Sequence, residues 1–339
     1  MTTVIGPKQI GMKLSTSDGW NLHEKLSLPP DERVKFICSQ GAPAAAILGD
    51  NQRPHVINFS VSNMEATSRI HPPSSDLSQW PGDPASENAL YDGRWGIHVH
   101  GILPDPNTGA MPLVSDCHFR WMNKEHGIYA CGSIRSERNH YDHCAAQGLQ
   151  LWFTAAGFPG GAKPGTLGTV PADWKNYTGG HLEVGSYGDH YDHCGLFHGR
   201  GRAAFACSLK AGPEHAVIAD CTFDHNHHPG GWLEWATSAE PGAVLIEHRP
   251  SCDIRRNAFN YDGMQTSTRP VILVQDIAGL ARLRANNVFA FGGKIAFVDC
   301  GDVLLEGCVW KGSGPPPRVS VIDNGVTIWK GDVTQAWST

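Results

Sequence analysis

The residues best suited to chemistry lie in a five-residue element, His-Tyr-Asp-His-Cys, which occurs twice, at 140–144 and 190–194. Neutral imidazole and carboxylate groups together bind zinc, manganese and similar ions. An aspartate beside a histidine also tunes a proton-transfer group near neutral pH. A repetitive chain duplicates such residues whether or not they act, so a polar ladder with a purely structural role is a third interpretation. The sequence leaves all three open.

The alternation of side chains along a strand predicts where these residues point. If Tyr141 and Tyr191 face inward, the histidine before each tyrosine and the aspartate after it face outward. His118 and Asp224 fall in the same two outward columns of other repeats, so histidines and aspartates would gather on one face. The candidate catalytic residues are therefore His140, Asp142, His190 and Asp192.

Two other histidine clusters could supply metal ligands. The strand-like segment 96–101 places two histidines on one face, and the segment 224–228 holds three histidines just before Pro-Gly-Gly. Together with the duplicated element, they give the candidate metal ligands His98, His100, His140, His190, His225 and His227. The sequence requires no cofactor. If an ion binds, we expect a divalent one, Ca²⁺ or Zn²⁺.

The elements that must position these residues are short strands of an internal repeat. Seven segments align on a central aromatic residue, and two positions earlier each has Asn, Asp or Cys. The aromatic residues lie 22, 50, 32, 36, 30 and 21 residues apart: Phe119, Tyr141, Tyr191, Phe223, Phe259, Phe289 and Trp310. A shortest period of 21–22 residues with insertions is typical of a solenoid and is too short for a propeller blade.

The aligned positions predict the interior of the coils. One residue separates the Asn/Asp/Cys position from the aromatic, so both side chains point to the same side of a strand. We expect each to stack on its equivalent in the next coil, with the buried amides bonded to neighbouring coils or turns. On this interpretation most of the ten cysteines are packing residues.

Four of these segments, beginning at Asp220, Arg256, Asn286 and Glu306, resemble coils of the right-handed parallel β-helix, as found in the pectate-lyase-like superfamily. The resemblance covers about residues 93–325 and implies an all-β solenoid. The superfamily includes polysaccharide lyases, glycoside hydrolases and phage tailspikes. Neither the calcium-and-base constellation of the lyases nor the full motif set of the polygalacturonase-like hydrolases has a match here. The resemblance therefore brings no catalytic residues with it.

The remaining segments suggest a simple domain organisation. Residues 1–92 lack the repeat and are expected to form an N-terminal cap or attachment region, because an open solenoid end needs covering. Residues 157–180 form a Gly/Pro-rich loop within the solenoid, and 326–339 are expected to form closing strands.

Composition limits the partners. A net charge of −6 argues against nucleic acid, and no apolar run is long enough for membrane insertion. Eleven tryptophans are many for 339 residues, and aromatic rings stack on sugars. The candidate glycan-binding residues lie in or beside coil loops: Trp121, Trp152, Trp174, Tyr177, Trp232 and Trp235.

Three functions follow from these observations. The first is a virion-associated phage protein (a tailspike, fibre or capsid-decorating component) that forms a homotrimer and engages a polysaccharide or another virion protein. The chain shows no signal peptide, which fits a virion part made in the host cytoplasm. The second is a polysaccharide lyase or glycoside hydrolase, and the third is a non-enzymatic intracellular scaffold.

Overall fold

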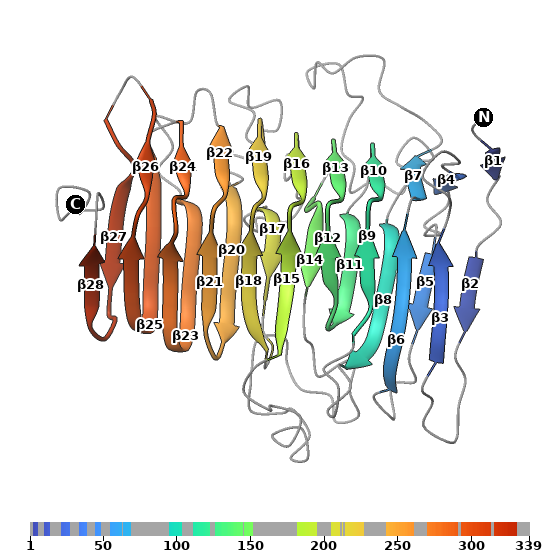
Figure 1. Cartoon of the computed structure of the whole chain (residues 1–339), viewed down its shortest axis with the longest axis horizontal. Coiled ribbons are helices and arrows are strands. Elements are labelled where there is room, and N and C mark those ends of the chain that lie inside the picture. Colours follow the sequence, from blue (N-terminus) through green and yellow to red (C-terminus); the bar gives the residue numbers. More distant parts are fainter. Residues whose placement is uncertain are drawn as a thin grey trace, which may run out of the picture.

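The computed structural model is a stack of parallel β-strands in curled sheets, a β-solenoid-like fold (Figure 1). It describes residues 3–5, 10–13, 22–27, 34–38, 45–48, 55–62, 64–68, 95–103, 111–122, 126–144, 146–151, 182–194, 205–210, 212, 214–226, 242–260, 270–290, 293–312 and 315–330. Within these ranges the regular secondary structure is entirely β, and none of them contains a helix that could span a membrane.

The strands form three parallel ladders, named A, B and C here. Ladder A contains β1 (Thr3–Ile5), β4 (Val34–Cys38), β7 (Met64–Ser68), β10 (His118–Arg120), β13 (His140–Asp142), β16 (His190–Asp192), β19 (Thr222–Asp224), β22 (Ala258–Asn260), β24 (Val288–Phe289) and β26 (Val309–Trp310). In Figure 1 these strands follow one another along the long axis, from β1 near the N-terminus to β26.

Ladders B and C supply the other two strands of each turn. Ladder B contains β2 (Ile10–Lys13), β5 (Ala45–Leu48), β8 (Trp95–Leu103), β11 (His126–Gly132), β14 (Leu149–Leu151), β17 (Phe205–Leu209), β20 (Gly242–Arg249), the first parts of β23 (Pro270–Arg284) and β25 (Lys294–Glu306), and β27 (Arg318–Ile322). Ladder C contains β3 (Leu22–Ser27), β6 (His55–Ser62), β9 (Leu113–Ser115), β12 (Arg135–Glu137), β15 (Glu183–Tyr187), β18 (His215–Ala219), β21 (Cys252–Arg255), the later parts of β23 and β25, and β28 (Thr327–Lys330). The chain visits A, B and C in turn, which confirms the predicted solenoid of parallel strands.

Left-handed residues form the corners between ladders. Among the described residues, every non-glycine residue with positive φ lies at a junction between one ladder and the next. Examples are Asp116 before ladder A (φ 55°), His143 after it (φ 53°) and Asp276 between ladders B and C (φ 52°). The left-handed region lets the chain turn sharply within one or two residues. Asn, Asp and His reach it more readily than most side chains.

The predicted aromatic column is confirmed. All seven aromatic residues of the alignment occupy one register position of ladder A, from Phe119 to Trp310. The six rings from Phe119 to Phe289 stack, with centroids 4.8–5.2 Å apart, and each is fully buried. Trp310 is partly buried at the end of the column and packs against the same core.

The predicted Asn/Asp/Cys column is also confirmed. The Asn139 side-chain oxygen accepts a hydrogen bond from the backbone N–H of Cys117, one coil before it (2.9 Å), and Asn257 does the same for Cys221 (2.9 Å). The Asn257 amide in turn donates to the Ile218 carbonyl of the preceding coil (3.0 Å). The column therefore satisfies buried backbone and amide groups and joins neighbouring coils.

The cysteines serve the same packing role. The eight cysteines whose side chains the structure describes are all free and buried: Cys117, Cys144, Cys194, Cys207, Cys221, Cys252, Cys300 and Cys308. Burial raises the pKa of the Cys300 thiol to about 11 and that of Cys308 to about 12. These thiols remain protonated, which suits packing and not metal binding or nucleophilic attack.

The three ladders extend into the N-terminal region. The strands from β1 to β7 pair in parallel with their successors, and Ala66 of β7 stands in register with Phe119. Residues 3–68 thus contribute solenoid strands although they lack the Asn/Asp/Cys signature. At the other end β28 is a further parallel strand, paired with β25. A cap or attachment role for 1–92 and closing strands over 326–339 stay predictions, and the expected loop at 157–180 lies outside the described residues.

Candidate functional site

The outward residues of ladder A form two columns. His118, His140 and His190 share one register position, and Thr222 follows them. Two residues along each strand, Asp142, Asp192 and Asp224 share the second position, with Arg120 before them and Asn260 after. The buried aromatic between the two positions fixes this arrangement by alternation. The four candidate catalytic residues are therefore neighbours, as predicted.

A third column lies at the corner that follows ladder A. Its members are Trp121, His143, His193 and His225, each in the left-handed region, with φ between 47° and 53°. The second histidine of each His-Tyr-Asp-His-Cys element belongs to this corner, and sequence reasoning did not select it. Strand alternation makes no prediction at that position, because the strand has already ended.

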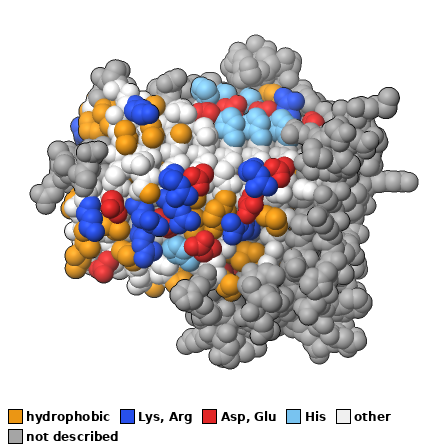
Figure 2. Space-filling view, viewed as in Figure 1, with side chains coloured by type: hydrophobic (Ala, Val, Ile, Leu, Met, Phe, Trp, Pro, Cys, Tyr) orange, Lys and Arg blue, Asp and Glu red, His pale blue; other side chains and the backbone are white. Residues whose placement is uncertain are grey.

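These three columns are named the His/Asp face, and Figure 2 shows it as two pale blue bands with red between them. The histidine column stacks with ring centroids 4.5 and 4.6 Å apart. In the corner column the ring centroids of Trp121 and His143 are 4.0 Å apart. The rings of His143 and His193, and then of His193 and His225, stack with centroids 4.4 and 5.0 Å apart. One side chain per coil, repeated at the strand separation, gives these short contacts.

Asp142 is held by cationic and imidazole groups on both sides. Its Oδ2 accepts a hydrogen bond from Nε of Arg120 (3.0 Å), and its Oδ1 contacts Nδ1 of His143. Burial opposes ionisation of Asp142, but the hydrogen bonds and charges of His143 and Arg120 outweigh it and hold the pKa well below the usual range. Asp142 is therefore a carboxylate at neutral pH.

Asp192 and Asp224 are paired with histidines instead. Oδ1 of Asp192 lies 2.8 Å from Nδ1 of His193 and 3.4 Å from Nδ1 of His225. Oδ2 of Asp224 lies 2.7 Å from Nε2 of His190, and its Oδ1 accepts a hydrogen bond from the Asn260 amide (2.9 Å). Partial burial opposes ionisation of both carboxyls, but these hydrogen bonds outweigh it and lower both pKa values.

The stacked histidines His140 and His190 differ in their preference for a proton. The hydrogen bond to Asp224 raises the pKa of His190. Burial, followed by repulsion from His190, lowers the pKa of His140. The face therefore places a protonatable imidazole beside one that stays neutral, with ionised carboxylates next to both.

This charge state limits the acid–base chemistry of the face. Glycoside hydrolysis needs one carboxylic acid that stays protonated as well as one carboxylate. All three aspartates of the face have lowered pKa values. Burial does raise the pKa of Asp189 to about 7, but that side chain is fully enclosed in the Asn/Asp/Cys column. The three aspartates of the face thus suit hydrogen bonding and cation binding better than proton donation.

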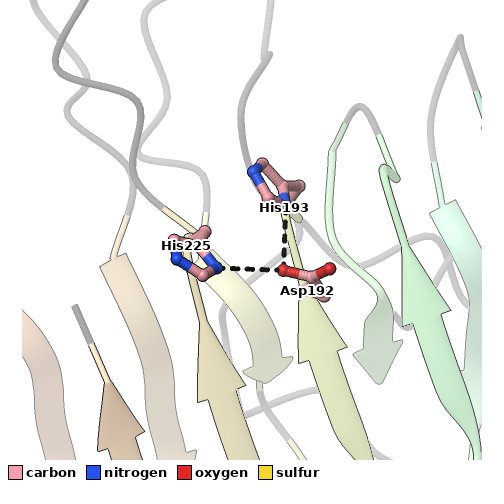
Figure 3. Close-up of side chains that lie close together, drawn as sticks. All are labelled: Asp192, His193 and His225. Atoms are coloured by element: carbon pink, nitrogen blue, oxygen red, sulfur yellow. Dashed lines mark hydrogen bonds and ion pairs between the residues drawn. The ribbon is translucent and has the colours of Figure 1, made fainter. Parts of the chain in front are cut away.

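Among the described residues, one group of at least three His, Cys, Asp or Glu brings its ligand atoms within 4.8 Å of one another: Asp192, His193 and His225 (Figure 3). Of the candidate metal ligands, His225 belongs to this group, whereas His140 and His190 stand in the neighbouring histidine column. His98 lies on β8 beside the Tyr129 ring, with centroids 5.5 Å apart. His100 is on the same strand.

Most of the candidate glycan-binding residues lie outside the residues that the structure describes. Trp121 is part of the corner column, but the other candidate glycan-binding residues lie outside the described residues, as does one candidate metal ligand: Trp152, Trp174, Tyr177, Trp232, Trp235 and His227. Comparisons with protein-family models, with curated protein sequences and with solved structures found no match. Function is therefore inferred from the site itself.

Proposed function

We propose that this protein is a structural adhesion component of a phage virion, built as a right-handed parallel β-helix, that holds an extended polysaccharide along its side. One observation carries the proposal: the His/Asp face is a row of ionised carboxylates and stacked rings that repeats from coil to coil. Carboxylates accept hydrogen bonds from sugar hydroxyls, and a repeated row suits a repeated ligand. The solenoid supplies the rigid base.

The same face favours binding over cleavage. Its aspartates are ionised and already paired with Arg120 or with histidines, so no described carboxyl group on it holds a proton for a leaving group. A lyase would instead need a free base beside a cation-binding acidic cluster. We therefore propose that the polysaccharide is retained and not cut.

The test is retention of bacterial surface polysaccharides on the immobilised full chain in the presence of a chelator, with the soluble fraction assayed for new reducing ends and unsaturated sugars. We expect at least one polysaccharide to be retained without product. The double variant Asp192→Asn, Asp224→Asn should weaken retention at least fivefold. Asp299→Asn, an exposed aspartate at a different corner, is the matched control and should change it less than twofold.

Two results would contradict the proposal. Release of sugar product that the double variant abolishes would make the protein a polysaccharide lyase or hydrolase. Failure to retain any polysaccharide would instead favour a scaffold that binds other proteins.

A further inference from the structure

The three-residue group on the His/Asp face has the composition and spacing of a metal site. Asp192 closes strand β16, His193 is the corner residue that follows it, and His225 is the equivalent corner residue one coil later, 32 positions along the chain. Figure 3 shows the carboxylate between the two imidazoles, both of which present Nδ1 to the same oxygen. Local folding of two adjacent coils is thus enough to assemble the group.

The distances fit a small divalent ion. Zinc binds imidazole nitrogen and carboxylate oxygen at about 2.0–2.2 Å, so neighbouring ligand atoms in a tetrahedral site lie about 3.4 Å apart. Asp192 Oδ1 and His225 Nδ1 are 3.4 Å apart, and Asp192 Oδ1 and His193 Nδ1 are 2.8 Å apart. A small increase in the distance between Asp192 Oδ1 and His193 Nδ1 therefore brings both ligand-atom distances to about 3.4 Å.

The ligand types favour zinc over calcium. Calcium takes six to eight oxygen ligands, whereas zinc accepts two imidazoles and one carboxylate. The side chain of His225 is 53% exposed and that of Asp192 is 26% exposed, so an ion can reach the group from solvent. Three protein ligands also leave one coordination position for water or another small ligand.

The preceding coil lacks an equivalent site, although it repeats the same residue types. There Asp142 and His143 stand in the same two columns, but Nε of Arg120 already donates to the Asp142 carboxylate (3.0 Å). A guanidinium so close to this carboxylate repels a cation, although it bonds to Oδ2 and not to Oδ1, the oxygen that faces the corner histidine. The repeat therefore contains one group of side chains that can bind a cation and one similar group in which the nearby Arg120 opposes cation binding.

We propose that Asp192, His193 and His225 bind one Zn²⁺ ion, which replaces the direct Asp192–His193 hydrogen bond and fastens two successive coils together at the corner after ladder A. This site goes beyond the proposed adhesion function. It does not depend on that function, because polysaccharide retention is measured in chelator and metal binding is measured without polysaccharide.

The test is titration of the chelator-treated full chain with Zn²⁺ by calorimetry, with bound metal counted after gel filtration. Other histidines can bind zinc weakly, so the decisive quantity is the difference between two matched variants. His225→Asn removes a proposed ligand, and His143→Asn changes the equivalent corner residue two coils earlier. Asparagine tolerates the left-handed backbone at both positions.

We expect His143→Asn to keep the tightest zinc site within twofold of the parent affinity. His225→Asn and Asp192→Asn should weaken that site at least tenfold and remove one ion per chain. Co²⁺ should give the visible absorption of a tetrahedral ion in the parent chain and not in His225→Asn. Ca²⁺ should produce no heat.

The proposal is overturned if the parent chain binds no zinc, or if His143→Asn and His225→Asn lose zinc to the same extent. Far-ultraviolet circular dichroism of each variant verifies that the solenoid is intact. A Co²⁺ spectrum typical of six-coordinate geometry would also contradict it.

Discussion

At the scale of single residues, Asp189 is the centre of a buried polar cluster. Asp189 accepts hydrogen bonds from Ser136 (2.5 Å), Ser186 (2.6 Å) and the backbone N–H of Asn139 (2.7 Å). The two serines also bond to the hydroxyls of Tyr141 and Tyr191, both at 2.8 Å. At the register position of the two serines, the neighbouring coils have Val114 and Ile218. In these two coils the residue of the aromatic column is a phenylalanine. Serine thus accompanies tyrosine, and an aliphatic residue accompanies phenylalanine.

Asp189 gives the protein a predictable dependence of stability on pH. Burial raises the Asp189 pKa from its ordinary value of 3.8 to about 7, so between these pH values the folded state binds a proton that the unfolded chain does not. The contribution of Asp189 to the free energy of unfolding therefore falls as pH rises from about 4 to about 7. At about 1.4 kcal/mol for each pKa unit, the loss is on the order of 4 kcal/mol.

The substitution Asp189→Asn removes this titration and keeps the shape of the side chain, which is asparagine at the same position in three other coils: Asn139, Asn257 and Asn287. We expect the variant to gain stability over the parent steadily from pH 4 to pH 7, measured by urea unfolding at each pH. Every other titrating group is common to both proteins. A stability difference that stays constant over this range would contradict the assignment.

At the scale of elements, the aromatic column and the corners hold the ladders in register. Every ring of the column packs on its equivalents, and glycines on ladder B leave room for it: a Cβ on Gly127 would lie 2.6 Å from the Tyr141 ring, and one on Gly96 would lie 2.4 Å from the Phe119 ring. In the sequence, apolar runs that follow the column aromatics begin with glycine at Gly127 and Gly148, and the close approach of the Tyr141 side chain to both positions explains this choice.

Truncation of one ring tests the column. Phe259 is fully buried between the rings of Phe223 and Phe289, so Phe259→Ala should lower the free energy of unfolding by about 3–5 kcal/mol. Asn260→Ala, at the next and exposed position of the same strand, should cost less than about 1 kcal/mol. Denaturant unfolding compares the two. Equal losses would show that the assigned inward and outward positions are wrong.

The same elements show what the sequence could and could not predict. The register of the aromatic column was predictable because an aromatic residue recurs two positions after Asn, Asp or Cys in seven coils. The first coils were missed because their equivalent positions hold Ile5, Phe36 and Ala66, which are all apolar but not all aromatic, and none follows Asn, Asp or Cys by two positions. A parallel ladder needs only backbone pairing, so strands can stack where the side-chain signature is absent.

The site was predictable in part for a similar reason. Alternation predicts that His140, Asp142, His190 and Asp192 point outward, and the structure pairs them in two adjacent columns of ladder A, with Asp142 only 8% exposed. The corner histidines follow the end of each strand, where the direction of a side chain depends on the left-handed turn and not on a period of two. His193 could have been identified from its repetition with His143 in the duplicated element, but its approach to His225 depends on the pairing of two coils.

At the scale of the whole molecule, the solenoid is one extended body with an exposed apolar group near its last described strands. Ile322, Val326 and Ile328 are 43%, 63% and 41% exposed, on or between β27 and β28. Isolated apolar side chains on a surface need no explanation, but three within residues 322–328, on and between two successive strands, suit a contact between chains. Such a contact is what the homotrimer expected from the sequence for a virion adhesion protein would need.

The most direct test of the proposed virion adhesion role is the mass of the native protein in solution, measured by light scattering after size exclusion, with and without a chelator. The account predicts a stable particle of three times the chain mass of 36.7 kDa in both conditions, because the proposed zinc ion joins coils within one chain. A monomer at all concentrations would contradict the assembled virion component and would favour a free enzyme or scaffold.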